Sequence, residues 1–284
     1  MNNTPVKTWS TPQHEEEKIP VPCTLCGCET FIPHFELYVH CAGCGLVQIN
    51  PQPVPGAVAL RYDLNHGNDY LNYELANEKT FLRLQELALS DAGFYKLEQK
   101  LLPANPEILD IGCATGALLS ALKDRGWNVR GVEVSGPQAA YCRKQRLNVS
   151  GISLEENRFQ DQFFDVVLAS NVIEHLNNPS GFAHEVKRIL KPGGYFFITT
   201  PNIDGLQARI FGSRWRSAIF DHLYLFSRRN LCTLLEKAGF TVEQIKTWGG
   251  LADGITFPFL KRIADKLAKP LGFGDVMIAR AICR

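Results

Sequence analysis

The chain has 284 residues, with 30 Lys and Arg against 29 Asp and Glu, so its net charge is +1. This balance excludes a broad basic surface for holding DNA or RNA, and 45% hydrophobic with 21% charged residues exclude global disorder. No apolar run reaches the roughly 18 residues needed to span a bilayer, and no apolar signal segment stands in the first twenty residues. We therefore expect a cytoplasmic protein with no transmembrane segment, whose nine cysteines are reduced.

The first third of the chain changes character several times. Residues 1–20 are polar and interrupted by proline, which predicts a flexible, solvated tail. Residues 21–50 hold four cysteines in two pairs, and the proline-rich run at 50–56 marks a boundary. Between about 72 and 102, apolar residues recur at three- and four-residue steps, which predicts a helix. We assign residues 51–104 to a linker and a helical lid.

Residues 105–284 alternate between short apolar strands and helices. Strands are expected at 107–111, 129–134, 149–153, 164–169, 195–199, 240–245 and 277–282, and helices at 117–125, 137–146, 181–190 and 231–238. The segment 191–194 is expected to close the third of these helices as a turn. Apolar strands that alternate with helices predict an α/β fold with a parallel sheet covered on both faces.

The four-cysteine module has the spacing of a zinc ribbon. Two residues separate the members of each pair, and 14 residues separate the pairs. The candidate ligands are Cys23, Cys26, Cys41 and Cys44. Four thiolates around one tetrahedral Zn²⁺ leave no open position, so this zinc would be structural and would stabilise a segment too small for its own core. Cys28, His34 and His40 are alternative ligands with less regular spacing.

A glycine turn follows the first strand of the α/β segment. Asp110, Gly112 and Gly116 form the pattern D-x-G-x-x-x-G, and ligands bind beyond the carboxyl ends of such strands. A dinucleotide-binding turn needs glycine where this chain has Ala114, so a cofactor without a pyrophosphate is favoured. Glu133 ends the second strand, 21 residues after Gly112, where a carboxylate can accept both ribose hydroxyls. The alternative is an ordinary turn with a surface glutamate.

These residues resemble the class I S-adenosylmethionine-dependent methyltransferases. The blocks that carry the resemblance are 109–116, 131–134, 164–168, 172–176 and 190–194. The resemblance implies a Rossmann-like, seven-stranded methyltransferase sheet over residues 105–284, with an antiparallel last strand. It places the methionine end of S-adenosyl-L-methionine over the glycine turn, its ribose on Glu133 and its adenine beside Ser153 and Leu154. The implied cofactor-binding residues are Asp110, Gly112, Cys113, Ala114, Gly116, Glu133, Ser153, Leu154 and Asn171.

Two histidines are candidates for the chemistry. A methyl acceptor with a hydroxyl must be aligned and must lose a proton, and an imidazole titrates near neutral pH. His175 follows the fourth strand and is a candidate general base, with a packing or capping role as the alternative. His222 is a second candidate, within a long segment, 202–226, that we expect to form a substrate wall. Arginines in that segment suit phosphate or carboxylate groups, and a solvated loop is the alternative; they are Arg209, Arg214 and Arg216.

A cysteine ribbon ahead of a methyltransferase core is similar to the arrangement in deoxysugar C-methyltransferases and related enzymes of polysaccharide and antibiotic pathways. The blocks 200–202 and 222–227 are similar to that group too. The resemblance implies a small-molecule acceptor: a sugar, nucleotide-sugar or natural-product precursor, methylated on O, N or C. An rRNA or tRNA methyltransferase that contacts RNA through the ribbon is the alternative, and the near-neutral charge weighs against nucleic acid. A non-enzymatic interaction protein is a third reading.

Two further segments have open roles. Residues 257–271 predict an apolar and basic helix that lies on a membrane surface, or packs on the rest of the chain or on a second subunit in a homodimer. Three tyrosines stand before or at the start of the long helix, namely Tyr62, Tyr70 and Tyr73. We expect them either to close over the cofactor as a lid or to be ordinary core or surface residues.

Overall fold

The computed structural model of the chain describes residues 17–55, 67–249 and 272–284. The predicted helix at 257–271, most of the predicted tail, and Tyr62 lie outside the described residues. Among the helices that are described, none combines the length and the apolar character needed to cross a membrane.

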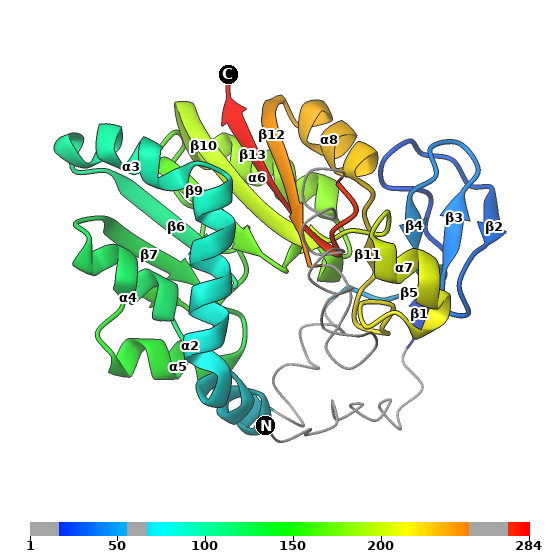
Figure 1. Cartoon of the computed structure of the whole chain (residues 1–284), viewed down its shortest axis with the longest axis horizontal. Coiled ribbons are helices and arrows are strands. Elements are labelled where there is room, and N and C mark those ends of the chain that lie inside the picture. Colours follow the sequence, from blue (N-terminus) through cyan, green and yellow to red (C-terminus); the bar gives the residue numbers. More distant parts are fainter. Residues whose placement is uncertain (1–16, 56–66, 250–271) are drawn as a thin grey trace, which may run out of the picture.

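A seven-stranded sheet forms the centre of the fold (Figure 1). Its strands are β6 (Glu107–Ile111), β7 (Asn128–Val132), β8 (Val149–Ser150), β9 (Phe164–Ser170), β10 (Leu190–Pro201), β12 (Phe240–Trp248) and β13 (Val276–Cys283). They lie in the order β12-β13-β10-β9-β6-β7-β8. The last strand, β13, runs antiparallel to both of its neighbours, and the other pairings are parallel. The predicted α/β fold class and seven-stranded sheet are thus confirmed.

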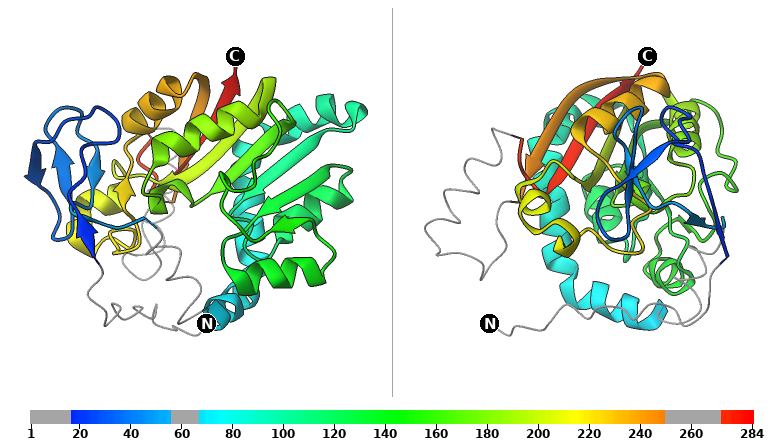
Figure 2. Two further views of the ribbon diagram at one scale, coloured as in Figure 1. Left: turned by 180° about the vertical axis from the view of Figure 1, so that it is seen from behind. Right: turned by 90° about the vertical axis from the view of Figure 1, so that its right-hand side faces the viewer.

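Helices cover both faces of the sheet. Side chains of successive strand residues point to opposite faces, so Val167 packs with one cluster and Val166 with the other. On the Val167 face lie α6 (Pro179–Ile189) and α8 (Arg228–Lys237), which stand in front in the left view of Figure 2. On the other face lies α4 (Ala117–Asp124), while α5 (Gly136–Lys144) packs near the β8 edge. The strands β6 and β9 are parallel neighbours, so their carboxyl ends lie at the same edge of the sheet. The strands that follow β6 in the chain, β7 and β8, lie on one side of it, and β9 and β10 lie on the other, so this edge is the topological switch point.

The predicted helix at 72–102 is two helices in the structure. They are α2 (Gly67–Asp91) and α3 (Phe94–Leu101), followed by the 3-10 turn η1 (Leu102–Ala104). The break lies at Gly93, whose φ of 79° is left-handed and unsuited to a continuing helix. The break lets Phe94, which is fully buried, stack on Trp127 at 5.6 Å between ring centroids. The second half of this segment is therefore part of the core.

A second sheet joins the cysteine module to the α/β domain. It has the order β11-β4-β3-β2, with β2 (Phe31–Pro33), β3 (Val39–Cys41), β4 (Val47–Gln48) and β11 (Tyr224–Leu225). The strand β11 comes from the segment 202–226, which also forms α7 (Leu206–Phe211) and the 3-10 turn η3 (Gly212–Arg214). Figure 1 shows the blue module beside the yellow α7. The module therefore shares its sheet with the segment that we predicted to form the substrate wall.

Two local expectations differ from the structure. The residues 191–194 lie inside β10, where the pairing with β9 shifts register between Leu190 and Tyr195. Gly193 has a φ of 79°, so the expected turn survives as a bulge in the strand. The end of the predicted tail is also ordered, because β1 (Lys18–Ile19) pairs with β5 (Gln52–Pro53).

Candidate active site and cysteine cluster

The four predicted zinc ligands converge in the structure. The sulfur atoms of Cys23 and Cys44 lie 3.4 Å apart, as do those of Cys26 and Cys41, and all four lie within 4.8 Å of one another. A tetrahedral Zn²⁺ about 2.3 Å from each sulfur places the sulfurs about 3.8 Å apart, so this cluster fits the ion. The alternative ligand Cys28 has its sulfur beside the Thr30 backbone instead.

The glycine turn after β6 has a left-handed backbone at three positions. The φ angles are 70° at Gly112, 48° at Ala114 and 75° at Gly116. A Cβ on Gly112 would lie 2.5 Å from the Val172 side chain, and one on Gly116 would lie 2.5 Å from Leu147. Glycine is therefore required at both ends of the turn, since any side chain would collide with the core. Cys113, between them, is buried.

Two buried carboxylates adjoin this turn. The oxygens of Glu133 accept the backbone N–H groups of Ala114 and Ser135, both at 2.9 Å. Oδ2 of Asp110 has no hydrogen-bond partner among the described residues. Burial raises the pKa of Glu133, and burial together with the Glu133 charge raises the pKa of Asp110 to about 8. An unsatisfied buried carboxylate oxygen beside a second carboxylate fits a ligand that carries hydroxyls and positive charge, as S-adenosylmethionine does.

The first turns of α2 bring Tyr70 and Glu74 close to these carboxylates, a pairing that the sequence did not predict. Burial raises the pKa of Tyr70, and the charges of Glu74 and Glu133 raise it further. Burial also raises the pKa of Glu74, which accepts a hydrogen bond from Tyr70 and feels the Glu133 charge. Tyr73, by contrast, is 51% exposed. The predicted lid thus has Tyr70 and Glu74 on the carboxylate side, and no local pattern distinguishes them from other residues of an amphipathic helix.

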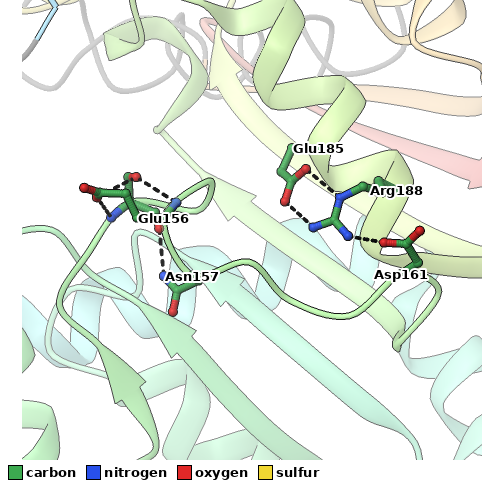
Figure 3. A network of polar contacts seen from close by, with 6 residues as sticks. Glu156, Asn157, Asp161, Glu185 and Arg188 are labelled. Carbon is green, nitrogen blue, oxygen red and sulfur yellow. Dashed lines mark hydrogen bonds and ion pairs between the residues drawn. The ribbon is translucent and has the colours of Figure 1, made fainter.

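The predicted adenine neighbours lie in the loop after β8. The Ser153 hydroxyl donates to Glu156 at 2.8 Å, and the Ser153 backbone N–H donates to the same carboxylate at 3.0 Å, in the network of Figure 3. Leu154 is buried in the core cluster of the Val167 face. Asn171 follows β9 with a φ of 54° and an exposed side chain, and its backbone N–H donates to Thr199.

The loop that carries Ser153 and Leu154 is also held at the end that leads into β9. Arg188, in the last turn of α6, forms ion pairs with Asp161 and Glu185, which Figure 3 shows as dashed lines. Asn157 also donates to the Ser153 carbonyl at 2.7 Å. The loop between β8 and β9 is therefore tied to α6 on one side and closed on itself on the other.

The structure brings His175 and His222 together. Their ring centroids lie 4.7 Å apart with an interplanar angle of 81°. Glu174 lies beside them and accepts the Thr200 hydroxyl at 3.0 Å. Burial raises the pKa of Glu174 to about 8, while burial and the neighbouring His175 lower the pKa of His222 to about 3. Glu174 and His175 follow β9, two and three positions after Val172, whose side chain contacts the glycine turn, whereas His222 comes from the segment 202–226.

The segment 202–226 is not a solvated loop. Trp215 and Phe226 are almost completely buried, and Tyr224 donates its hydroxyl to the Asn177 carbonyl at 3.3 Å. The three arginines that we proposed as anion ligands are exposed; they are Arg209, Arg214 and Arg216. Arg209 lies over the Phe273 ring, 5.0 Å from its centroid. The segment is therefore packed against the core, and its three arginines are exposed to solvent.

Sequence relatives of this chain are methyltransferases. A family model described as a methyltransferase domain matches residues 81–245, more than half of the 284 residues. A protein of Mycolicibacterium smegmatis named a probable S-adenosylmethionine-dependent methyltransferase is 33% identical, over 49% of this chain and 54% of its own. The ubiquinone biosynthesis O-methyltransferase of Pseudomonas aeruginosa is 32% identical, over 35% of this chain and 46% of its own. The chain spans about half the length of the curated relatives it matches.

Solved structures show the same fold. A crystal structure of an S-adenosylmethionine-dependent methyltransferase from Thermotoga maritima, described as a possible histamine N-methyltransferase, matches with a TM-score of 0.54 at 24% identity. The match covers 80% of this chain and 98% of that one. The family match, the seven-stranded sheet and the glycine turn all indicate the same methyltransferase fold. This chain belongs to the methyltransferase domain family and has the fold of the S-adenosylmethionine-dependent enzymes.

Proposed function

We propose that the chain transfers a methyl group from S-adenosylmethionine to a small polar acceptor, namely a sugar, nucleotide-sugar or natural-product precursor. One relationship carries the proposal. The glycine turn and the Glu174–His175–His222 cluster lie at the same edge of the sheet, joined by the contact between Val172 and Gly112. A cofactor site and a set of proton-accepting groups at one edge are what methyl transfer to a polar atom requires.

The cofactor would be held by the turn and its two carboxylates. Gly112 and Gly116 permit the left-handed bends of the turn, and Glu133 would accept the ribose hydroxyls. The buried, unsatisfied Asp110 favours a ligand that is positively charged. When bound, S-adenosylmethionine supplies a methyl group on a sulfonium, which is a good leaving group. We place Ser153 beside the adenine and Asn171 beside the methionine end.

The histidines would act on the acceptor. Both ring Nδ1 atoms contact backbone carbonyls, so each ring is oriented by the fold before any acceptor binds. A proton taken from an acceptor hydroxyl would go to Nε2 of His175, because a carbonyl partner requires Nδ1 to carry a hydrogen and the lowered pKa of His222 makes that ring the weaker base. The exposed arginines of the wall segment suit a phosphate of the acceptor.

The cysteine cluster would hold a structural Zn²⁺. None of the nine cysteines, all within the described residues, forms a disulfide in the structure, which suits a reducing compartment such as the cytoplasm. We assign residues 21–50 to the ribbon, 51–104 to the linker and helical segment, and 105–284 to the methyltransferase domain. The shared β11–β4 pairing makes the ribbon a support for the acceptor wall.

Calorimetry with S-adenosylmethionine tests the cofactor, and methyl-labelled cofactor with nucleotide-sugars tests the acceptor class. We expect one cofactor per chain and label transfer to at least one nucleotide-sugar. Labelled rRNA and tRNA serve as the contrasting substrates, since transfer to them in place of sugars would show that the acceptor class is wrong. A folded protein that gives no binding heat would end the enzymatic proposal.

A further inference from the structure

Three possible metal-ligating side chains meet near the proposed acceptor site. Glu174 and His175 belong to the 3-10 turn η2 (Ile173–His175), and His222 precedes β11 in the wall segment. One ligand atom from each lies within 4.8 Å of the others. The group is distinct from the four-cysteine cluster, because it shares no residue with it. Two imidazoles and one carboxylate form a ligand set that divalent transition metals favour.

Hydrogen bonds fix the tautomer of both histidines. Nδ1 of His175 lies 2.9 Å from the Asp221 carbonyl oxygen, and Nδ1 of His222 lies 2.8 Å from the Ser217 carbonyl oxygen. A carbonyl oxygen only accepts, so both Nδ1 atoms carry hydrogen and the lone pair of each neutral ring resides on Nε2. Metal-ligating histidines are typically oriented in this way, with the second ring nitrogen donating to a carbonyl or carboxylate.

The carboxylate of Glu174 supplies an independent observation. Its side chain is fully buried, and one oxygen accepts the Thr200 hydroxyl at 3.0 Å. The other oxygen, Oε1, finds no hydrogen-bond partner in the described part of the chain. A buried carboxylate oxygen without a partner is costly, and a cation bound to it would remove that cost. The residue that carries this atom belongs to the same small group as the two oriented imidazoles.

We propose that Glu174, His175 and His222 bind one divalent transition-metal ion, of the class of Zn²⁺, Mn²⁺, Fe²⁺ or Co²⁺. Three protein ligands leave at least one coordination position open, as in catalytic rather than structural metal sites. An oxygen atom of the acceptor, or water, would take that position. With the ion bound, the Nε2 lone pairs would hold the ion, and the ion would lower the pKa of the bound hydroxyl in place of a histidine base. This last step rests on the proposed function, whereas binding of the ion does not.

The fold explains why these ligands meet. The strand β9 ends at Ser170 and leads into η2, which carries two of the ligands. The third ligand is held by the ribbon, since β11 pairs with β4 and the Ile49 N–H donates to the Leu223 carbonyl at 2.9 Å. The ribbon would therefore position one ligand of a second metal site.

Titration with Mn²⁺, followed by electron paramagnetic resonance, tests the site in the full chain with its thiolate metal in place. Mn²⁺ is chosen because thiolate sites disfavour it, while carboxylate and imidazole ligands accept it. We expect the wild-type chain to bind one Mn²⁺. The variants Glu174→Gln and His222→Gln should each weaken that binding by about tenfold or more.

The matched control is His184→Gln. His184 is exposed on α6, and its Nδ1 contacts the Ser180 carbonyl at 2.8 Å, so it shares the ring geometry of the two ligands without their neighbours. This variant should bind Mn²⁺ as the wild-type chain does. Equal affinity in Glu174→Gln and in wild type would overturn the proposal, as would a wild-type chain that binds no Mn²⁺.

A Co²⁺ spectrum of the wild-type chain tests the site without any variant, so the test does not depend on whether the variants fold. Co²⁺ at this site should give visible bands without the intense sulfur charge-transfer absorption of a thiolate site, and charge-transfer absorption alone would contradict the assignment. Calorimetry with S-adenosylmethionine on the same samples separates the two proposals. A chain that binds the cofactor but no Mn²⁺ refutes the metal site alone, and the reverse result refutes the proposed function alone.

Discussion

The hydroxyl of Tyr38 lies 3.0 Å from the backbone carbonyl oxygen of His222, and 2.8 Å from that of Ile219. Tyr38 belongs to the cysteine module and is only 3% exposed, so its hydroxyl proton is shared between two carbonyls of the wall segment. A side chain of the ribbon thus supports the backbone of a proposed active-site histidine. The cysteine module is therefore coupled to the segment that carries His222 and is not only appended to the α/β domain.

Replacing Tyr38 by phenylalanine should destabilise the protein by about 1–3 kcal/mol, because the buried carbonyls lose their donor while the ring still fills its space. Urea unfolding measures this change. The control is Tyr73→Phe, whose hydroxyl is on an exposed side chain and whose loss should change stability by less than about 0.5 kcal/mol. Equal effects of the two variants would show that the Tyr38 contact contributes nothing.

Loss of the ribbon metal should impair methyl transfer more than cofactor binding. The variant Cys26→Ser removes one of the four clustered thiolates, whereas Cys28→Ser removes a thiol outside the cluster. We expect Cys26→Ser to lose zinc, unfold at a lower temperature and transfer methyl groups more slowly, with little change in S-adenosylmethionine affinity. Metal analysis, thermal unfolding and calorimetry measure these quantities. A zinc loss in Cys28→Ser of the same size would mean that the ligand set is wrong.

Glu133→Ala should weaken S-adenosylmethionine binding by about 1–3 kcal/mol, since the ribose hydroxyls and the backbone N–H groups of Ala114 and Ser135 lose their acceptor. Glu133→Gln keeps one acceptor oxygen and should lose less. Calorimetric dissociation constants check both, with Glu155→Ala, an exposed glutamate in the following loop, as the control. An unchanged dissociation constant in Glu133→Ala would place the ribose elsewhere.

The buried Asp110 makes stability depend on pH. Its pKa is raised to about 8 in the folded chain, above the ordinary value near 3.8. The folded state therefore binds the proton more tightly than the unfolded state, so this contribution is complete below about pH 4 and is lost as pH rises to about 8. Asp110→Asn resembles the protonated acid, and it should become more stable relative to wild type across that range.

The gain of Asp110→Asn over wild type should grow by at most about 1.4 kcal/mol per pH unit. Urea unfolding of the cofactor-free protein at several pH values between 5 and 8 measures it. The exposed Asp124→Asn serves as the control, with a difference that stays constant over the same range. A constant difference for Asp110→Asn as well would mean that the carboxyl is ionised at no cost in the folded chain.

Local patterns predicted much of the sheet. The strand at 107–111 was predicted residue for residue, because a short apolar run stands between a proline and a glycine turn. The helix at 117–125 was predicted to within one residue, and the cysteine pairs came together as their spacing indicated. The long helix was wrong at Gly93, since a single glycine inside an apolar period does not by itself show that the chain turns there.

Contacts between distant segments could not be read from such patterns. The placement of Tyr70 within electrostatic range of the Glu133 carboxylate, and the hydrogen bond from Tyr38 to the wall segment, depend on how whole elements pack. The strand β11 within the segment 202–226 was not predicted, because it has only two residues and pairs with the ribbon, far away in the chain. A strand of that length carries too few residues to show a period.

The order of residues alone determined the class of the sheet, the glycine turn and the thiolate cluster. Each depends on spacings of a few residues, which backbone geometry converts directly into a bend of the chain or a convergence of side chains. Only the tertiary structure decided that the ribbon continues into β11 and that His175 and His222 lie beside a buried Glu174. Those relationships arise from burial and strand pairing between segments far apart in the chain, which no local spacing encodes.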